Sequence, residues 1–483
     1  MHDDEAPAHS VQRDLAPVKR TPIPKFQLFV LLAIQFAEVM TALVIYPFVV
    51  QFVRDTGITG GDEAKTGFYA GLLESAFFMA ESLTVFQFGR LSDIYGRRPV
   101  LLLGPLGLAM SMFGFGLSKT FWWLFILRCA QGAFNGNIGV AKTAMNEISD
   151  PTNVADIFSY LSMMWSMGAT LSPFIGGTLS SPATKWPDTL GRFQLLHDYP
   201  YFLPCAVAGS TAFLSFVFGY LGLKETLPSA VARARKRKGG PATETDPLLS
   251  ASSATAARHD PQEVRTVREL LTRPVCTALL CHGMLTFCDM TFSALLPLVC
   301  ATPIELGGLG LEPQSIGLIM GLCGITNAII QLLFGGRVIR HFGARRVFTA
   351  GFCALIFAFS MYPLRSILAR RAGRVDGAVA AVLAAQLSSS CFMYFSYSAT
   401  IMFTMESAPN KANVGGVNGL AQMVGTTLRA AAPSCASSLF ALSVQHNLLG
   451  GYLVYLVLGA IALVAVRCSL LLPRRLRSEA EGS

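Results

Sequence analysis

Charged residues are scarce in this sequence. Asp, Glu, Lys and Arg make up 14% of its 483 residues, where soluble proteins carry roughly 25%, and 52% of the residues are hydrophobic. Only two sizeable polar stretches interrupt the apolar sequence, residues 1–20 and approximately residues 224–272. A soluble fold cannot bury so large an apolar surplus, so the composition predicts a protein that lies in a lipid bilayer.

Cysteine pairs, zinc-ligand spacings and catalytic motifs are also missing. The 11 Cys are scattered through apolar stretches, which excludes a disulfide framework and a zinc cluster, and no metal site is predicted. No nucleotide-binding loop or Ser/His/Asp arrangement stands outside the apolar runs, so neither an enzyme nor a cofactor is expected. The net charge of +9 does not indicate a nucleic-acid partner, because the bases lie at the ends of apolar runs and in one loop.

Apolar runs follow one another along almost the whole chain. Runs of about 18 residues or more can cross a hydrocarbon core about 30 Å thick, because a helix rises about 1.5 Å per residue. Charged residues, Gly and Pro separate these runs. They predict twelve transmembrane helices, at 26–53, 68–88, 99–117, 121–140, 157–179, 200–221, 275–301, 315–334, 347–364, 378–402, 414–440 and 449–466.

The polar stretches divide and orient the predicted spans. An even number of spans places both chain ends on one side, and most of the 38 Lys and Arg lie on that side if both ends are cytoplasmic. A group of bases, Arg365 to Arg374, departs from this rule in the external loop after the ninth span. We expect an all-α polytopic protein with a cytoplasmic N-terminal tail (1–25), an N-terminal six-helix bundle (26–223), a flexible cytoplasmic linker (224–273), a C-terminal six-helix bundle (274–472) and a cytoplasmic C-terminal tail (473–483).

A repeated loop supports two related bundles. The second predicted span is followed by residues 89–98, GRLSDIYGRR, and the eighth by residues 336–346, GRVIRHFGARR. Both copies place Gly-Arg first, a Gly seven positions later, and Arg after it. A duplicated six-helix unit is the simplest explanation, and parallel repeats of this kind occur in membrane transporters.

With this repeat the chain resembles the major facilitator superfamily, and residues 89–98 are similar to the signature loop of that family. The resemblance implies a gating loop in which glycines allow a tight reversal, an acid caps a neighbouring helix and paired bases stay cytoplasmic. A topogenic loop alone would explain the bases but not the spaced glycines and the acid. The second copy has Arg340 in place of the acid. The implied gating residues are Gly89, Asp93, Gly96, Arg97 and Arg98.

The fifth predicted span contains a second motif. Small residues and a proline recur there and permit close helix packing and a kink. The pattern is similar to the superfamily signature associated with proton-driven antiporters, with Ser172 where Gly is more usual. It therefore favours antiport, although tight packing alone is the alternative. The residues of this antiporter-like motif are Gly168, Ser172, Pro173, Gly176 and Gly177.

Four shorter stretches narrow the resemblance. They resemble a fungal branch related to the zinc-induced-facilitator-like transporters, which are grouped with drug:proton antiporters. The resemblance covers residues 26–472 apart from the linker. The stretches are 71–75 (GLLES), 128–139 (RCAQGAFNGNIG), 199–204 (YPYFLP) and 307–311 (GGLGL).

Charged residues inside the predicted spans are candidate functional residues, because each costs about 2.5–3.5 kcal/mol on insertion scales. In the implied fold, spans 1, 4, 7 and 10 face a central cavity, which would expose Glu38, Arg128 and Asp289 there. The six residues are Glu38, Glu74, Glu81, Arg128, Asp289 and Arg429.

These residues divide into two sets of candidates. Carboxyls without a fixed counter-charge are expected to be protonated part of the time, so the proton-coupling candidates are Asp289, Glu38 and Glu74. Glu81, closer to the cytoplasmic end, ranks lower. Arg128 is equally a structural partner of Glu38 or Glu74, and Arg429 either binds an anionic substrate or braces span 11. The substrate-cavity candidates are Gln35, Arg128, Gln386 and Arg429.

The predicted function is secondary active transport by alternating access. A monomeric proton-coupled antiporter that exports small organic compounds or metal complexes is favoured, with a small-molecule solute, protons and membrane lipid as partners. A symporter or facilitator that imports a nutrient and a non-transporting transceptor remain open. The linker also carries an acid-x-x-x-Leu-Leu pattern ending in Leu248 and Leu249, which is typical of a sorting-adaptor site. A vacuolar and a plasma-membrane location therefore both remain open.

Overall fold

The structure, a computed structural model, describes residues 24–149, 153–227, 267–409 and 414–473. Leu248 and Leu249, the sorting pattern of the predicted linker, lie outside the described residues. The elements up to residue 222, which we call the N-terminal half, are α1 (Lys25–Leu43), α2 (Val49–Asp55), α3 (Glu63–Tyr95), α4 (Arg97–Gly116), α5 (Phe121–Asn135), α6 (Ile138–Glu147), α7 (Val154–Leu179), α8 (Pro182–Lys185), η1 (Leu190–Arg192), α9 (Gln194–Asp198) and α10 (Phe202–Gly222).

The elements from residue 267 onward form what we call the C-terminal half. Pro274 and Pro313 stand in the first turns of two of its long helices, where a missing N–H leaves no helix bond unmade. The elements are α13 (Val267–Leu270), α14 (Arg273–Ala301), η2 (Ile304–Leu306), α15 (Pro313–Phe342), α16 (Ala344–Ala372), α17 (Gly377–Ser407), α18 (Val414–Gln445), η4 (Leu448–Gly451) and α19 (Leu453–Ser469).

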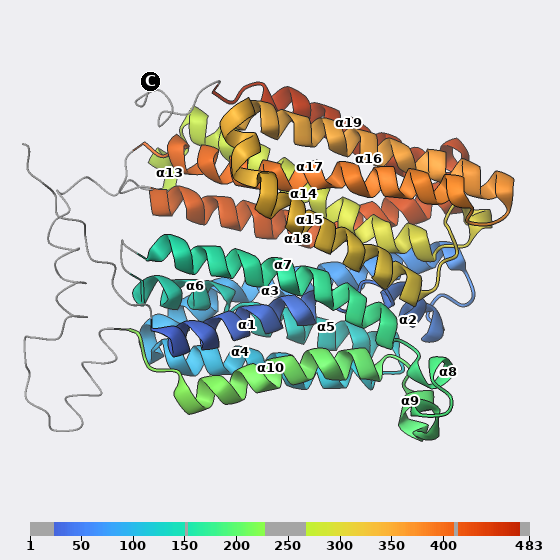
Figure 1. Ribbon diagram of the computed structural model, residues 1–483, viewed down its shortest axis with the longest axis horizontal. Coiled ribbons are helices and arrows are strands. Elements are labelled where there is room, and N and C mark those ends of the chain that lie inside the picture. Colours follow the sequence, from blue (N-terminus) through green and yellow to red (C-terminus); the bar gives the residue numbers. More distant parts are fainter. Residues whose placement is uncertain (1–23, 150–152, 228–266, 410–413, 474–483) are drawn as a thin grey trace, which may run out of the picture.

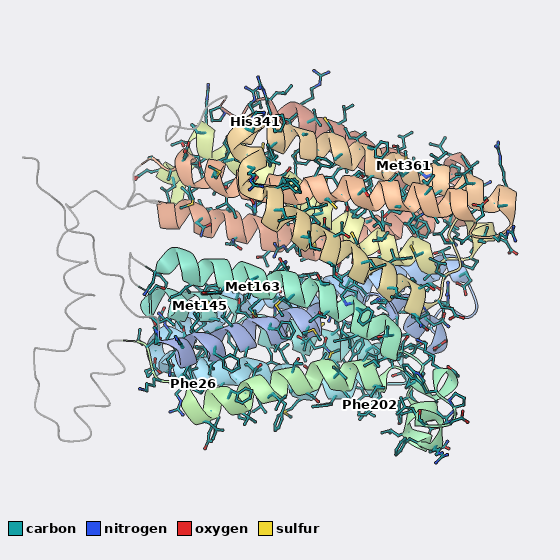
Figure 2. All side chains as sticks on the ribbon, in the orientation of Figure 1. Phe26, Met145, Met163, Phe202, His341 and Met361 are labelled. Atoms are coloured by element: carbon teal, nitrogen blue, oxygen red, sulfur yellow. The ribbon has the colours of Figure 1, made fainter. Side chains whose placement is uncertain are left out.

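The helices of each half lie together, and the two halves lie side by side with their long helices running in similar directions (Figure 1). We call the end of the helices that holds Tyr95, Leu223 and Val267 the linker end. The opposite end, with residues 56–62, 181–201 and 302–312, is the loop end. Phe26, at the start of α1, and Phe202, at the start of α10, stand near these two ends of the N-terminal half (Figure 2).

The halves contact each other chiefly through α3 with α18 and through α7 with α15. Glycines let α7 and α15 approach closely: a Cβ added to Gly177 would lie 2.7 Å from the Cα of Gly317. Between α3 and α18, the Ser434 N–H donates a hydrogen bond to Ser75 Oγ at 2.9 Å. Both contacts lie in the parts of these helices that are nearer the loop end.

Polar groups also join the halves at the loop end itself. Arg54 Nη2 donates to the carbonyl oxygen of Ala301 at 2.9 Å, while its Nε pairs with Glu63 Oε2 at 2.7 Å. Lys185, after α7, interacts electrostatically with Glu312, before α15. Burial lowers the pKa of the Lys185 ammonium, and the Glu312 carboxylate acts in the opposite direction. The loop end is therefore held closed by backbone packing and by charges.

Each predicted span overlaps a helix or a pair of helices. Among the described residues, seven helices are by length and apolar composition sufficient to cross a membrane, so the count of twelve crossings stays a prediction. The fourth span differs from its predicted limits. α5 ends at Asn135 and α6 continues from Ile138 to Glu147, well past the predicted end at residue 140. Gly136 and Asn137 form a bend between α5 and α6, and we treat the two helices together as one helical rod. Residues that follow the bend therefore still belong to this rod.

The ninth predicted span also ends later than expected. α16 continues to Ala372, so the prediction that Arg365, Arg370 and Arg371 lie in an external loop was wrong; Arg374 follows the helix. Arg365 is fully buried, donates from Nη1 to Gln386 Oε1 at 3.0 Å, and stacks 4.8 Å from the centre of the Tyr362 ring. These contacts offset part of the cost of burying the base, and its Nη2 has no hydrogen-bond partner among the described residues.

Candidate functional site

Glu38 and Gln35 lie together on α1, as their spacing of one turn predicts. Glu38 is buried, and the Gln35 amide donates a hydrogen bond to its Oε2. Its Oε1 has no hydrogen-bond partner among the described residues. Two charged groups from neighbouring helices, Glu81 on α3 and Lys142 on α6, interact with it electrostatically. No ion pair within 4 Å fixes the Glu38 charge in the described part of the chain.

Lys142 belongs to this cluster although the sequence did not single it out. Lys142 lies beyond the predicted end of span 4 at residue 140. In the structure it belongs to α6, which follows α5 after the bend at residues 136–137. Lys142 is half-buried and interacts with Arg429, Glu38 and Glu81. The signal that could have revealed it is its spacing of seven residues from Asn135, which places both on one helical face across the bend.

Asp289 occupies the corresponding region of the C-terminal half. It is buried on α14, and the hydroxyl of Tyr397 on α17 donates a hydrogen bond to its Oδ2 at 2.7 Å. Arg429 interacts with it at longer range. Tyr397 is a second residue that sequence reasoning missed, because tyrosines are common in apolar spans and carry no charge to mark them.

Arg429 connects the two groups. It lies half-buried on α18 and interacts electrostatically with Asp289, Glu81 and Lys142. Its Nε has no hydrogen-bond partner among the described residues, and no acid there approaches it within ion-pair distance. His282, two turns before Asp289 on α14, also interacts with it. We call Glu38, Glu81, Lys142, Asp289 and Arg429 the central cluster; both halves contribute to it.

Arg128 has a different environment from the one its charge suggested. It is fully buried, and Nη2 donates to the Ala42 carbonyl oxygen at 2.8 Å where α1 ends. Its guanidinium lies 4.4 Å from the centre of the Phe77 ring. The described residues show no ion pair between Arg128 and Glu74, whose Oε2 has no hydrogen-bond partner there. Arg128 therefore satisfies the free carbonyls at the break between α1 and α2.

Gln386 is also placed away from the central cluster. Its Nε2 donates to the carbonyl oxygen of Ala358 at 3.0 Å, and its Oε1 accepts from Arg365. It is fully buried, and both ends of its amide are used between α17 and α16. These contacts brace the C-terminal half.

The signature loop forms an ionic network at the linker end. Arg97 pairs with Asp93 at 2.7 Å and with Glu147 at 3.0 Å. The Asp93 side chain remains 65% exposed and caps no neighbouring helix in this arrangement. Instead Glu225, which sequence reasoning missed, accepts hydrogen bonds from the backbone N–H groups of Arg97 at 2.7 Å and Arg98 at 3.1 Å, and so caps α4. A Cβ on Gly89 would meet no atom within 4 Å.

The antiporter-like motif packs α7 against α1 and α15. A Cβ on Gly168 would lie 2.7 Å from Val39 Cγ1, and one on Gly176 would lie 2.0 Å from the Val44 carbonyl oxygen. Ser172, fully buried beside Pro173, donates to Gly168 O within α7. The motif thus fixes the segment of α1 that carries Glu38, and its last glycine, Gly177, lies against Gly317 at the seam between the halves.

Metal binding has no evident place in this arrangement. Across the described ranges, no group of three or more His, Cys, Asp or Glu side chains is positioned to hold a metal ion. The central cluster combines acids with bases, and the Tyr397 hydroxyl binds one of the acids. Side chains of these types are able to exchange protons and to bind a charged or polar solute.

Comparison with known proteins gives this arrangement a context. A family profile described as Major Facilitator Superfamily matches residues 28–433. The major facilitator-type transporter psiT2 of Psilocybe cyanescens is 34% identical over 94% of this chain and 91% of its own length. Efflux pump azaK of Aspergillus niger is 30% identical over 87% of this chain and 82% of its own.

More distant proteins extend the similarity. Protein ZINC INDUCED FACILITATOR-LIKE 1 of Arabidopsis thaliana is 25% identical over 92% of this chain and 91% of its own. Among solved structures, a D-xylose-proton symporter is 13% identical with a TM-score of 0.65, over 94% of this chain and 99% of that one. At that identity the likeness concerns the fold alone.

Proposed function

The chain belongs to the major facilitator superfamily, as its repeated loop predicted, and on this premise we propose that it exports a small organic solute in exchange for protons. It is a membrane transporter and not an enzyme. Proton coupling and the direction of transport are the proposed parts. Relatives named as an efflux pump and as a multidrug transporter support export.

The observation that carries the proposal is the kind of partner that each buried acid has. Glu38 accepts from an amide and Asp289 from a phenol, and neither forms an ion pair within the described residues. An amide and a hydroxyl each offer a donor and an acceptor, so they can hydrogen-bond to a carboxylate or to a carboxylic acid. A guanidinium or ammonium in direct contact would instead favour the ionised form. These acids are therefore suited to gain and lose a proton.

The net charge of the central cluster, in which Arg429 and Lys142 are the bases, links the protonation of these acids to the binding of the solute. When the acids are ionised, the central cluster carries more negative charge and attracts a cationic or amphoteric solute. When they are protonated, that attraction falls and the solute is released. Because both halves contribute to the cluster, the change in charge also alters the energy of bringing the halves together, which couples proton binding to alternating access.

The arrangement described here is closed at the loop end, where Arg54, Ala301 and the Gly177–Gly317 contact join the halves. Alternating access requires a second arrangement in which these contacts separate and the linker end closes. In that state Asp93, which is exposed here and pairs with Arg97 of its own half, is proposed to cap a helix of the C-terminal half. The packing of α7 on α1 keeps Glu38 in place while the halves rotate.

The test uses the full chain in vesicles and a solute identified by a growth-resistance screen. Asp289→Asn should abolish accumulation driven by a proton gradient while preserving solute-for-solute exchange, because exchange needs the binding site but no net proton movement. Glu38→Gln should weaken proton-driven accumulation in the same way. Asp55→Asn is the matched control: Asp55 also accepts from a tyrosine hydroxyl, that of Tyr201, but lies at the loop end.

The outcomes separate the candidate functions. Full proton-driven accumulation in both the Asp289→Asn and the Glu38→Gln proteins would remove these residues from the mechanism. Accumulation of the solute on the side towards which protons move would make the chain a symporter. Transport that ignores the proton gradient would make it a facilitator, and absence of transport for every screened solute would favour the transceptor.

A further inference from the structure

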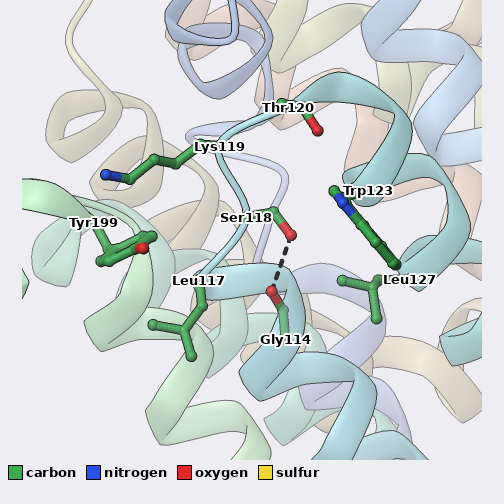
Figure 3. Close-up of a pocket in the computed structure, with 8 residues that line it drawn as sticks. All are labelled: Gly114, Leu117, Ser118, Lys119, Thr120, Trp123, Leu127 and Tyr199. Atoms are coloured by element: carbon green, nitrogen blue, oxygen red, sulfur yellow. Dashed lines mark hydrogen bonds between the residues drawn. The ribbon is translucent and has the colours of Figure 1, made fainter.

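A pocket at the loop end of the N-terminal half takes no part in the proposed transport cycle. It has a volume of about 530 Å³ and lies between the end of α4, residues 117–120, the first turns of α5 and Tyr199 (Figure 3). This volume is within the range of about 300–1,000 Å³ that small-molecule sites occupy. All of its lining residues belong to one half, so rotation of the halves leaves its shape unchanged.

One wall of the pocket is basic and aromatic. The Lys119 ammonium stands 4.6 Å from the centre of the Tyr199 ring, and both residues line the pocket. Lys119 is exposed and has no carboxylate within ion-pair distance among the described residues. The ring face steadies the ammonium but provides no acceptor oxygen. The N–H groups of Lys119 are therefore available to an anionic group that enters the pocket.

The opposite wall is apolar and faces outward. Trp123 and Leu127 stand across the pocket from Tyr199, with Leu117 beside it (Figure 3). Trp123 is 60% exposed and its neighbour Trp122 is 63% exposed. Tryptophan and lysine gather at the level where the acyl chains of a bilayer meet the headgroups. A ligand of this pocket must therefore carry an anion and an apolar part together.

We propose that this pocket binds one phospholipid of the leaflet at the loop end, with its phosphate on Lys119 and its acyl chain along Trp123 and Leu127. A soluble anion would use the Lys119 wall alone and gain nothing from the apolar wall. A neutral lipid would fill the apolar wall and leave the ammonium unpaired. A phospholipid satisfies both walls. Because the pocket lies within one half, the lipid anchors that half at the membrane surface in either state of the transporter.

The experiment measures lipid retention by the full chain, purified in detergent. Native mass spectrometry counts bound phosphatidylglycerol, and thermal melting is followed with added dioctanoyl phosphatidylglycerol or inorganic phosphate. The variants are Lys119→Gln, which removes the cation, and Lys119→Arg, which keeps it. Tyr199→Leu removes the ring that steadies the cation. Lys25→Gln is the matched control, because Lys25 is an exposed lysine at the start of a helix at the linker end.

The unaltered chain is expected to retain one phosphatidylglycerol and to melt at a higher temperature when the short-chain lipid is added. Lys119→Gln should weaken binding about tenfold, as the loss of one charge-assisted hydrogen bond predicts. Tyr199→Leu should weaken it less, and Lys119→Arg and Lys25→Gln should preserve it. Equal retention by Lys119→Gln and the unaltered chain would overturn the proposal. So would stabilisation by inorganic phosphate equal to that by the lipid, since it would identify a site for a free anion.

Discussion

The loops at residues 89–98 and 336–346 have a similar backbone conformation at their second glycine but carry different charges. Gly96 has φ 108° and ψ 162°, Gly343 has φ 81° and ψ 144°, and each directly precedes a long helix. The second residue after each glycine is an arginine, and it makes the same contact in both loops. Arg98 Nη2 donates to the Tyr220 carbonyl oxygen at 2.9 Å, and Arg345 Nη2 donates to the Leu470 carbonyl oxygen at 2.7 Å.

The acid occurs in one copy only. Asp93 pairs with Arg97 in the first loop, whereas the second loop has Arg340 at the matching position. Both halves therefore need the tight turn and the bond to the end of their last helix, which hold each bundle together. Of the two loops, the one in the N-terminal half has an acid at this position, the charge that we propose forms a breakable contact with the other half. We therefore propose that the turn serves the fold and that the acid serves the gate.

The largest effect is expected from removing that acid. Asp93→Asn should slow transport about tenfold or more while leaving the amount of inserted protein unchanged, because a hydrogen bond to a charged group contributes about 1.5–3 kcal/mol. Initial transport rates normalised to protein at the membrane measure the effect. Arg340→Asn in the second copy is the control and should change the rate less than about twofold. Equal losses in the two variants would end the distinction between the loops.

A smaller effect is expected from the glycines, and it should differ between the copies. Both occupy a backbone region that costs other residues about 1–3 kcal/mol, so Gly96→Ala and Gly343→Ala should each lower thermal stability. A Cβ on Gly96 would also lie 2.4 Å from Glu225 Oε2, whereas one on Gly343 would meet nothing within 4 Å.

The Gly96→Ala protein should therefore melt at a lower temperature than the Gly343→Ala protein, by the equivalent of about 1 kcal/mol for the disturbed helix cap. Melting curves of the purified proteins in one detergent measure this difference. The same melting temperature for both variants would show that Glu225 adds nothing to the first loop.

The smallest effect concerns the shared arginine contact. Arg98→Gln and Arg345→Gln should each reduce stability by about 0.5–1.5 kcal/mol, the usual contribution of one hydrogen bond. The two reductions should be equal, since the partners are backbone carbonyls in equivalent places. A reduction confined to one variant would contradict a common role for this contact.

The sequence predicted the family and the repeated loop, and it placed Gln35 one turn from Glu38, because these follow from motifs and spacing along the chain. It did not predict the partners of Arg128 and Gln386, since both bind groups on other helices. Lys142 was missed because a charge after a long apolar run reads as the end of a span. Whether a charge ends a span or continues within it depends on tertiary contacts that spacing along the chain does not contain.

The central claim is that protonation of Glu38 and Asp289 determines which end of the transporter is open. Spin labels at exposed positions, Tyr95 and Phe342 at the linker end and Gly60 and Leu449 at the loop end, report the two openings without any solute. Distances measured by pulsed electron resonance should change in opposite senses at the two ends when the pH is lowered.

The decisive comparison is with the Glu38→Gln, Asp289→Asn double variant, whose side chains imitate the protonated acids. The account predicts that this protein shows the low-pH distances at every pH. The same pH response in the double variant as in the unaltered chain, or distances in the unaltered chain that do not change with pH, would contradict it.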